Sequence, residues 1–464
     1  MLHVNDLLIE EHLCGENKSK TVMLDSITPI GAIEKQGDMR VALSLDGIAF
    51  EEITGGCAQG ETALFVKLET GSEGALKVFV GEGYIAIPAP RWSDAFKRYD
   101  DWAGGDGIYS FNLDDGNDAY GHAAARTMFL FSDTIVSKVD RETLRRIEPV
   151  YMPNNTFAIV TGSSPEAPGA FEFFVKKDED GKPMSGIRPN RDCFDFEGKG
   201  EDLSKAYLWN QDGVVLNGKF YLVLHLITED RTREEGFQFR VLGECIAEAE
   251  IVDGIPDISN AKQYATGLQY VDERVTIRYG AGIMPYTKEA GYPDGDGYVY
   301  VYGRTNPPMG VVSLCIARVR PEHFTDWTQW RFFDGAGFTD DITKSAPIVG
   351  HVSSELSVTP IVTGRNRGKF LAVFKYDDLR SDYVACAVGD SPAGPFGEPR
   401  KVFYSGADKL SPTVYTYNAK AHPHLSIPER LLVSYNVNCR TWWEHIENGH
   451  MYRPRFMELI DTTA

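Results

Sequence analysis

The sequence lacks a paired-cysteine framework and a long apolar run, and it is poor in basic residues. Its seven cysteines are odd in number and widely spaced, with no Cys-x-x-Cys pair, which argues against a disulfide framework or a zinc site. No stretch approaches the roughly 20 apolar residues that a membrane-spanning helix needs. The 67 acidic residues exceed the 47 basic ones and give a net charge of −20. Such a charge repels nucleic acid and anionic membranes, so a neutral substrate is the simplest expectation.

Several catalytic signatures are also absent. The sequence has no GxxxxGK phosphate loop, no GxSxG elbow and no HExxH motif, so NTPase, serine hydrolase and zinc peptidase functions lack support. No metal site or required cofactor is expected, although a cation such as calcium could lie in a central channel. The first residues, MLHVNDLLIEEHLCGENKSK, lack the basic start and apolar middle of a secretion signal. The chain as given is therefore expected to be cytoplasmic, and an exported protein without its leader would look the same.

Short strand patterns separated by turns fill the first part of the chain. They are TVMLDSI (21–27), MRVALSL (39–45), ETALFVKLE (61–69) and ALKVFVGEG (75–83). The pattern predicts a small β-sandwich-like accessory region over residues 1–92, either structural or carbohydrate-binding. The prolines of IPAPRWSD (87–94) mark its boundary. Helical periodicity is scarce in the rest, and DRETLRRI (140–147) is the clearest short helix candidate.

A repeated unit organises residues 93–464. Five times, a polar turn opens a strand and an aromatic-rich second strand follows. The opening segments are GGDGIYSFNL (104–113), WNQDGVVLNG (209–218), RYGAGIMPYT (278–287), SSELSVTPIV (353–362) and NAKAHPHLSI (418–427). With about four strands per repeat, the pattern predicts an all-β fold, a five-bladed β-propeller. The matched positions in the five repeats are Asp106, Asp212, Gly282, Glu355 and His422.

Three of these matched positions are acids. The first strand of each propeller blade lines the central channel, so Asp106, Asp212 and Glu355 should meet at one funnel. Like charges forced together push their pKa values apart. One acid can then keep its proton while another is ionised, which is what glycoside hydrolysis needs. Asp133 ends the strand that follows Asp106 and should lie at the same sheet edge. Each aspartate taken singly could equally be a turn residue.

Aromatic, arginine and asparagine side chains are expected around the funnel. Aromatic rings can stack on the apolar face of a sugar, while Arg and Asn can bind hydroxyls. A histidine on the last channel strand could orient an acid, bind a metal or be an ordinary core residue. The candidate substrate-binding residues are Trp102, Arg126, Asn155, Trp209, Tyr279, Arg304 and His422, with Asn154 and Arg278 at the same predicted edge. Each of them could instead serve in packing.

A family resemblance rests on several motifs between about residues 100 and 460. GGDGIYSFNL, FLFSDT, YVYVYGR, AVGDSPAGPFGEP, YNAKAHPHLS, LLVSYNVN and YRPRF together resemble the domain-of-unknown-function propeller proteins that include bacterial endo-D-arabinanases. SPAGPFGEP is also similar to blade ends of the arabinanase, xylosidase and invertase-like glycoside hydrolases. The resemblance implies a five-bladed propeller, a carbohydrate substrate and acid-driven glycosidic cleavage. It makes Asp106 the counterpart of a first-blade catalytic aspartate and Asp212 that of a second-blade one.

The sequence departs from that pattern in the third repeat. RYGAGIMPY carries no acid where the related enzymes place their proton donor. The nearest candidate is Glu355, on the fourth repeat, and Asp133 becomes a rival for the second catalytic carboxylate.

These observations predict a glycoside hydrolase that acts on a furanoside-type or related oligosaccharide, with arabinan-like polymers as suspected substrates. Asp106 is the expected base or nucleophile, Glu355 the acid and Asp212 a modulator. One alternative is a non-catalytic sugar-binding propeller. Another is a glycoside phosphorylase, whose phosphate pocket would draw on Arg278, Arg304, Arg453 and Arg455. The oligomeric state is not indicated by the sequence.

Overall fold

A computed structural model of the protein describes residues 1–56, 58, 60–121, 125–190, 193–194, 205–234 and 236–464. Within these ranges almost every element is a strand, and the α-helices are α1 (Pro90–Ala95) and α2 (Trp442–Glu447). No helix in the described ranges has the length and apolar character needed to cross a membrane. The structure is therefore nearly all-β, as the sequence predicts.

The helix predicted at residues 140–147 is wrong. Asp140 Oδ1 accepts hydrogen bonds from the backbone N–H groups of Glu142 (3.1 Å) and Thr143 (2.7 Å), which close a turn. Leu144 then adopts a left-handed conformation with φ of +58°. The chain enters β8 (Arg146–Tyr151) directly afterwards. An aspartate that bonds its own following backbone competes with helix formation, and here the turn wins.

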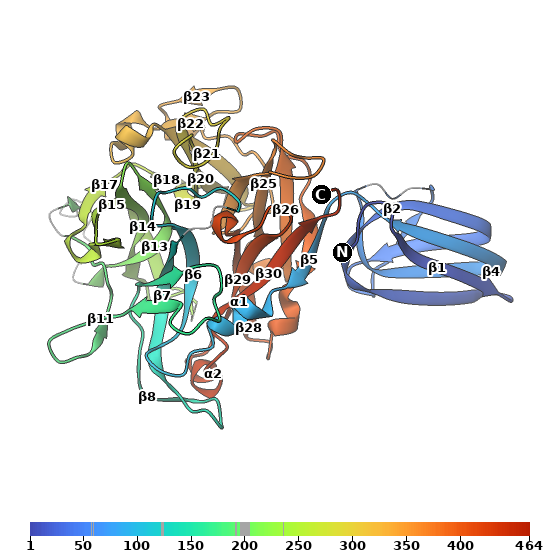
Figure 1. Cartoon of the computed structure of the whole chain (residues 1–464), viewed down its shortest axis with the longest axis horizontal. Coiled ribbons are helices and arrows are strands. Elements are labelled where there is room, and N and C mark those ends of the chain that lie inside the picture. The colour runs from blue at the N-terminus through green and yellow to red at the C-terminus, as the bar shows by residue number, and fades with distance from the viewer. Residues whose placement is uncertain (57, 59, 122–124, 191–192, 195–204, 235) are drawn as a thin grey trace.

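In the N-terminal region two long strands, β2 (Lys18–Ser44) and β4 (Thr62–Val80), take the place of the four short strands that the sequence predicts. The strands of this region are β1 (Leu7–Cys14), β2, β3 (Glu51–Ile53) and β4, in the order β1-β4-β2-β3. Register shifts bend β2 so strongly that Val66 of β4 pairs with both Val22 and Leu43. The bent sheet encloses its own apolar core and forms a sandwich-like body beside the rest of the chain (Figure 1).

Five further sheets, the blades, form most of the remainder of the molecule. Blade one contains β6 (Trp102–Asn112), β7 (Arg126–Val139), β9 (Thr156–Thr161) and β10 (Phe171–Phe174), with β8 beside β7. Blade two contains β13 (Tyr207–Leu216), β14 (Lys219–Glu229), β15 (Phe239–Val252) and β17 (Lys262–Ala265), with β16 (Ile255–Pro256) also paired to β15. Blade three contains β18 (Gln269–Val271), β19 (Thr276–Tyr286), β20 (Tyr298–Asn306), β21 (Ser313–Val319), β22 (Arg331–Phe333) and β23 (Phe338–Thr339).

Blade four contains β24 (Leu356–Pro360), β25 (Phe370–Lys375), β26 (Tyr383–Gly389) and β27 (Arg400–Tyr404). Blade five contains β28 (Val414–Ala421), β29 (Leu431–Cys439), β30 (Pro454–Asp461) and β5 (Tyr84–Pro88). A small hairpin, β11 (Lys176–Lys177) with β12 (Pro183–Met184), lies outside the blades.

The inner strands of the five sheets form a ring. β6 contacts β13, β13 contacts β19, β19 contacts β24 and β24 contacts β28, while β29 returns to β6. The fifth sheet closes with β5, which comes from before the other blades and pairs with β30. The predicted five-bladed β-propeller is confirmed. Because β5 completes a blade, that blade includes residues from inside the range 1–92 that the sequence assigns to the accessory region.

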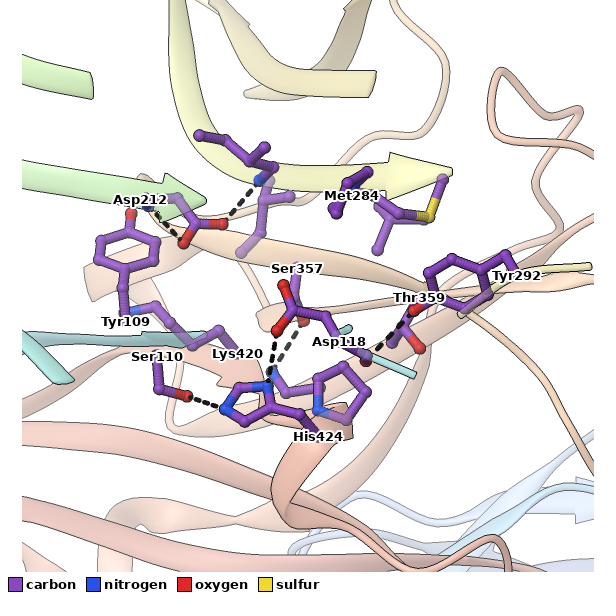
Figure 2. Close-up of a pocket in the computed structure, with 17 residues that line it drawn as sticks. Tyr109, Ser110, Asp118, Asp212, Met284, Tyr292, Ser357, Thr359, Lys420 and His424 are labelled. Atoms are coloured by element: carbon purple, nitrogen blue, oxygen red, sulfur yellow. Dashed lines mark hydrogen bonds and ion pairs between the residues drawn. The ribbon is translucent and has the colours of Figure 1, made fainter. Parts of the chain in front are cut away.

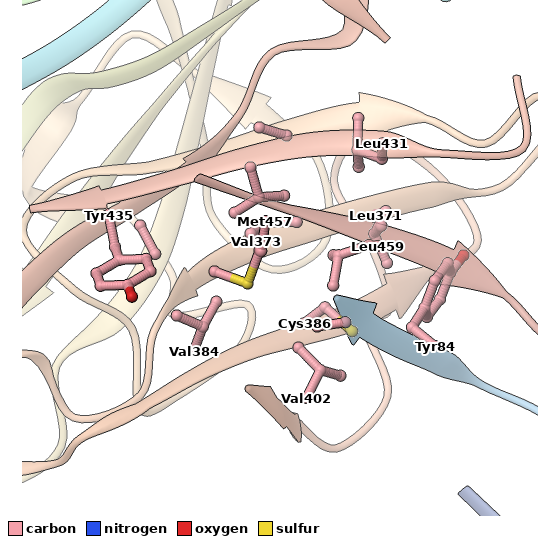
Figure 3. Packing of buried hydrophobic residues seen from close by; sticks show 14 of the residues in the cluster. Tyr84, Leu371, Val373, Val384, Cys386, Val402, Leu431, Tyr435, Met457 and Leu459 are labelled. Carbon is pink, nitrogen blue, oxygen red and sulfur yellow. The ribbon is translucent and has the colours of Figure 1, made fainter. Parts of the chain in front are cut away.

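The apolar core lies between neighbouring blades. Figure 3 shows the layer between blades four and five, where Val373 and Val384 face Met457 and Leu459. Each residue of β25 is buried, and its sequence FLAVFK is an almost unbroken apolar run, as expected for a strand covered on both faces. These packed layers hold the inner strands in fixed positions around the channel.

Candidate active site

A cleft of about 460 Å³ opens at the start of the inner strands, and its walls come from all five blades. Its size falls within the range of about 300–1,000 Å³ typical of small-molecule sites. Four carboxyl groups line it, those of Asp106, Asp133, Glu355 and Asp378. The cleft therefore gathers three of the four predicted catalytic acids.

Asp106 and Asp133 lie side by side on neighbouring strands. Gly105 of β6 pairs with Thr134 of β7 and Gly107 pairs with Phe131, which places the two aspartates across from each other. Asp106 Oδ2 accepts a hydrogen bond of 2.6 Å from the Tyr417 hydroxyl. Its other oxygen, Oδ1, is enclosed and has no hydrogen-bond partner among the described residues.

Asp133 is held by two N–H donors on a single oxygen. Its Oδ1 accepts hydrogen bonds from Trp209 Nε1 at 2.8 Å and from Asn154 Nδ2 at 3.1 Å. Burial, together with the negative charge of Asp106, raises the pKa of Asp133 to about 7. Burial also raises the pKa of Asp106, while the Tyr417 hydroxyl opposes that rise. The two carboxyl groups titrate as a pair that retains a proton close to neutral pH.

Glu355 is held by the fifth blade. Its Oε1 accepts a hydrogen bond of 2.8 Å from Asn418 Nδ2, and its Oε2 forms an ion pair with Lys420. The Lys420 ammonium also donates to the carbonyl of Gly107 and lies 4.0 Å from the centre of the Tyr109 ring. Burial raises the pKa of Glu355 to about 7, although the charge of Lys420 acts in the opposite direction. This contact connects blades four, five and one beneath the cleft.

Asp212 does not lie in the cleft, so its predicted place at the funnel rim is wrong. It lines a cavity of about 40 Å³ further along the channel, together with Asp118 and His424 (Figure 2). Its Oδ2 accepts a 2.6 Å hydrogen bond from the backbone N–H of Ile283 in the next blade. Burial raises its pKa to about 7. A bulge in β13 explains the difference, because it turns Gln211 to the cleft and Asp212 to the opposite side.

His422 does not reach the cleft, and of the three roles that the sequence leaves open for it, that of a core residue is the one it has. Its ring is buried and lies close to Phe129 and Phe456. Ser110 Oγ lies 2.6 Å from its Nδ1, and Ser434 Oγ lies 2.8 Å from its Nε2. Burial holds its pKa well below the usual range. β28 begins at Val414, earlier than the predicted start at residue 418, so this repeat was placed out of register and Asn418 reaches the cleft instead.

Two predicted aromatic contacts are core residues. Trp102 is buried against Phe131 and Phe173, with ring centres 4.9 and 4.7 Å away. Tyr279 is buried against Phe332, and its hydroxyl lies 2.7 Å from Ser345 Oγ. Both side chains lie on inner strands but face the space between sheets, so they do not reach a ligand in the cleft.

Two predicted polar contacts are also placed elsewhere. Asn155 is buried, and its amide group bonds the backbone of Ile187 and Leu208. Arg126 pairs with Asp114 at 2.8 Å and donates to the carbonyl of Gly254 at 3.0 Å. It is the first residue of β7, whereas Asp133 lies in the middle of that strand. The functional reading of these two residues as substrate contacts is therefore wrong.

Trp209 and Arg304 do line the cleft, together with residues that the sequence did not single out. The missed residues are Gln211, Tyr415, Tyr417, Asn418 and Asn438 on the cleft wall, with Lys420 behind Glu355. Tyr415 and Tyr417 alternate along β28 in the segment VYTYN. That period of two is the signal that would have found them, because alternate residues of a strand point to the same face.

The described residues give no direct support for a channel cation such as calcium, which stays a prediction. Among the described residues no group of three or more His, Cys, Asp or Glu side chains is arranged to hold a metal ion. In the cavity of Figure 2, His424 Nδ1 lies 3.4 Å from Asp118 Oδ1 and His424 Nε2 lies 3.2 Å from Ser110 Oγ. The Lys420 ammonium already supplies a positive charge to this part of the channel, which disfavours a second cation nearby.

Residues 90–461 match the model of a protein family described as a domain of unknown function, DUF5005. The chain belongs to the DUF5005 family. The predicted resemblance to domain-of-unknown-function propellers is therefore confirmed at this level, while a relation to endo-D-arabinanases stays a prediction. A comparison of this DUF5005 protein with curated proteins finds no match.

Several solved structures resemble the DUF5005 protein. One is a Bacteroides ovatus protein described provisionally as a hydrolase, with 19% identity, a TM-score of 0.60, and coverage of 82% of this chain and 91% of that chain. A GH43 enzyme of Xanthomonas citri bound to xylotriose has 12% identity, a TM-score of 0.36 and coverage of 80% and 92%. An α-L-arabinofuranosidase of Clostridium thermocellum has 12% identity, a TM-score of 0.35 and coverage of 68% and 80%. The Bacteroides ovatus protein shares the fold, whereas the other two are distant.

Proposed function

We propose that the protein is a glycoside hydrolase that cleaves a furanoside-type or related oligosaccharide in the cleft. The observation that carries this proposal is the paired Asp106 and Asp133, two carboxyl groups that together retain a proton near neutral pH. Glycosidic cleavage needs one carboxyl group to protonate the leaving oxygen and another to act as base or nucleophile. The fold shared with the Bacteroides ovatus protein is compatible with this function.

Within the pair, Asp106 is the base or nucleophile and Asp133 the proton donor. The charge of Asp106 is among the causes that raise the pKa of Asp133, so Asp106 ionises first as the pH rises. Asp133 accepts both of its hydrogen bonds on Oδ1, which leaves Oδ2 to carry the proton. This proposal differs from the sequence-based expectation that Glu355 is the acid.

Glu355 is a positioning residue in this account. Both of its oxygens accept hydrogen bonds, one from Asn418 and one from Lys420, and a carboxyl group held in this way is a poor donor to a sugar. The Lys420 ammonium, which Glu355 contacts, donates to the carbonyl of Gly107, the residue after Asp106. The ion pair thereby fixes the backbone beside the proposed base.

The cleft walls suit a sugar ring. Trp209 lies beside Asp133, and Tyr415 and Tyr417 lie on the fifth blade. Aromatic faces bind the apolar faces of sugars, and the amides of Asn418 and Asn438 can bond hydroxyls. The Tyr417 hydroxyl contacts Asp106 directly, so a ring stacked at this wall would lie next to the proposed base.

Product release from a panel of arabinans, fructans, xylo-oligosaccharides and short furanosides tests the proposal. The wild type is compared with Asp106→Asn and Asp133→Asn, and with Asp180→Asn in an exposed turn as the matched control. We expect turnover of at least one substrate by the wild type and the control, and a loss of at least about 100-fold in both cleft variants.

Sugar binding without turnover in any of these proteins would overturn the hydrolase proposal. That outcome would favour a non-catalytic sugar-binding propeller. Because each variant replaces a carboxyl group with an amide of the same shape, a circular dichroism spectrum equal to that of the wild type establishes that the fold is kept.

A further inference from the structure

Two arginines lie across from each other on one wall of the cleft. A pair of positive charges is unexpected there, because the protein as a whole is negatively charged. Arg278 of β19 and Arg304 of β20 are directly paired in the strand register. Both line the cleft that holds the acids. Arg233 and Arg240 of blade two also line it, and Arg233 pairs with Asp230 at 3.4 Å. Like charges placed opposite each other on neighbouring strands destabilise a sheet. The chain carries a net charge of −20, so acidic partners for these arginines were available in the composition.

Neither arginine forms an ion pair within the part of the chain that the structure describes. Arg278 Nε donates to Gln269 Oε1 at 2.9 Å, which is a neutral acceptor. Arg304 Nη1 is buried and has no hydrogen-bond partner there. Two partly buried guanidinium groups that line one cleft are thus left with unused donors.

The charge of Glu244 favours the charged form of Arg278, but the two side chains form no ion pair. Glu244 Oε2 lies 2.5 Å from His225 Nδ1, and its Oε1 is buried with no hydrogen-bond partner among the described residues. Burial and the neighbouring charge of Arg304 lower the pKa of Arg278 to about 10. The protein therefore maintains two positive charges at a position where they repel each other, and an anionic ligand would relieve that repulsion.

The acids and the arginines occupy different blades. Asp106 and Asp133 lie on blade one and Glu355 at the start of blade four, whereas Arg278 and Arg304 lie on blade three. The cleft therefore has a carboxyl side, where a glycosidic bond would be cleaved, and a guanidinium side. A neutral sugar needs only single hydrogen bonds from such a wall, while paired guanidinium groups match the two or three oxygens of a carboxylate, sulfate or phosphate.

We propose that Arg278 and Arg304 bind an anionic substituent of the substrate, so that the glycan is an acidic one that carries a uronic acid carboxylate or a sulfate or phosphate ester. The inference rests on the proposed function for the presence of a glycan in the cleft, but binding can be measured without cleavage. An acidic glycan takes the place of the neutral substrate that the net negative charge of the protein suggests. The other arginines considered for a phosphate pocket lie elsewhere, since Arg453 bonds the Ser93 carbonyl and Arg455 pairs with Asp408.

The test measures binding of matched oligosaccharides by calorimetry with the full chain. The probes are galacturonan oligosaccharides with free carboxylates, the same oligosaccharides as methyl esters, and sulfated and phosphorylated oligosaccharides with their unmodified counterparts. The proteins are the wild type, Arg278→Gln, Arg304→Gln and the control Arg274→Gln, whose side chain is 81% exposed on the same β18–β19 hairpin and lies outside the cleft.

We expect one anionic class to bind the wild type at least tenfold more tightly than its neutral counterpart. Both cleft variants should lose this preference, whereas Arg274→Gln keeps it. The preferred class identifies the substituent. Because each cleft variant removes half of a like-charge pair, neither should unfold at a lower temperature than the wild type, which separates lost binding from lost folding.

Equal binding of anionic and neutral probes would overturn the inference, and so would an equal loss of both in the arginine variants. A third outcome, from the product-release measurement, also overturns it. If product appears only with added inorganic phosphate, Arg278 and Arg304 would hold a phosphate co-substrate. Arginine-dependent preference for an anionic glycan without any cleavage would sustain the inference while the hydrolase proposal fails.

Discussion

At the scale of single residues, the environment of each carboxyl group decides its chemistry. Asp272 accepts hydrogen bonds from the backbone N–H groups of Arg274 and Val275, which lower its pKa to about 2. Asp118 lies in the channel, where burial raises its pKa to about 8. An aspartate is therefore an anion at the first site and keeps its proton at the second. Burial in the cleft gives Asp106 and Asp133 the second kind of environment.

Replacing Asp118 with Asn tests this view of the channel. Folded Asp118 keeps its proton up to about pH 8, while in the unfolded chain it ionises near 3.8. The unfolded state therefore binds fewer protons between these values, and stability falls as the pH rises. Asp118→Asn removes this effect, so its unfolding free energy relative to the wild type should increase steadily from pH 5 to pH 8.

Urea unfolding at pH 5, 6.5 and 8 measures the difference. His424, Asp212 and Asp115 surround Asp118 and remain in both proteins. Asp180→Asn, in an exposed turn, is the control for the loss of one carboxyl group. A constant difference between Asp118→Asn and the wild type at all three pH values would contradict the account.

At the scale of elements, bulges in the inner strands decide which residues reach the cleft. The bulged residues are Gln211 and Asp212 in β13, Gly280 and Ala281 in β19, and Asn418 and Ala419 in β28. Each bulge shifts the alternation of faces within a strand. A bulge thus places Asn418 beside Glu355 and directs Asp212 away from the cleft.

Gly280 should be essential to its bulge. It has φ of +117°, and a Cβ atom there would lie 2.5 Å from Val223 Cγ1. Gly280→Ala should lower the unfolding free energy by about 1–3 kcal/mol, because it combines backbone strain with overpacking. Gly243→Ala in β15 is the control, since nothing lies within 4 Å of its Cβ position, and it should change stability by about 0.5 kcal/mol or less. Equal effects of the two substitutions in chemical denaturation would contradict this reading.

The bulges also mark the limit of prediction from sequence. Period-two alternation locates the inner strands and predicts that Asp106 and Asp133 lie together, as they do in the cleft. The predicted strand end at Asp133 is wrong, because β7 continues to Val139. Bulges leave no such periodic signal, so Asp212 was placed on the wrong face. The predicted register of the last repeat is wrong, because β28 begins at Val414 and the predicted opening turn at Asn418 lies inside this strand. The sequence does not distinguish Trp102 and Tyr279 from the aromatic residues that line the cleft. Their burial between two sheets arises only when the five blades pack together.

At the scale of the whole molecule, a strand from before the blades closes the ring. β5 pairs with β30 along residues Tyr84 to Pro88, and the two ends of the chain meet at the same place, where Val4 N–H donates to the Thr462 carbonyl at 2.9 Å. Without β5 the fifth blade would present the free edge of β30. The cleft depends on this closure, because β28 of the same blade carries Tyr417 and Asn418.

Two truncated chains test the role of β5. A chain of residues 81–464 keeps β5 and should unfold cooperatively. A chain of residues 89–464 lacks Ile85 and Tyr84, which are 6% and 8% exposed in the full chain, and should lose at least about 3 kcal/mol of stability. Thermal unfolding followed by circular dichroism measures both, and equal midpoints would contradict a closing role for β5.

The most direct measurement of the central claim compares two leaving groups. A dinitrophenyl glycoside of the identified sugar needs little protonation of its leaving oxygen, whereas the oligosaccharide needs a proton donor. Asp133→Asn should lower kcat by at least about 100-fold on the oligosaccharide and only slightly on the dinitrophenyl glycoside. Asp106→Asn should abolish turnover of both, since it removes the base or nucleophile. The reverse pattern, or full activity of either variant on the oligosaccharide, would contradict the assignment of the Asp106–Asp133 pair as the catalytic acids.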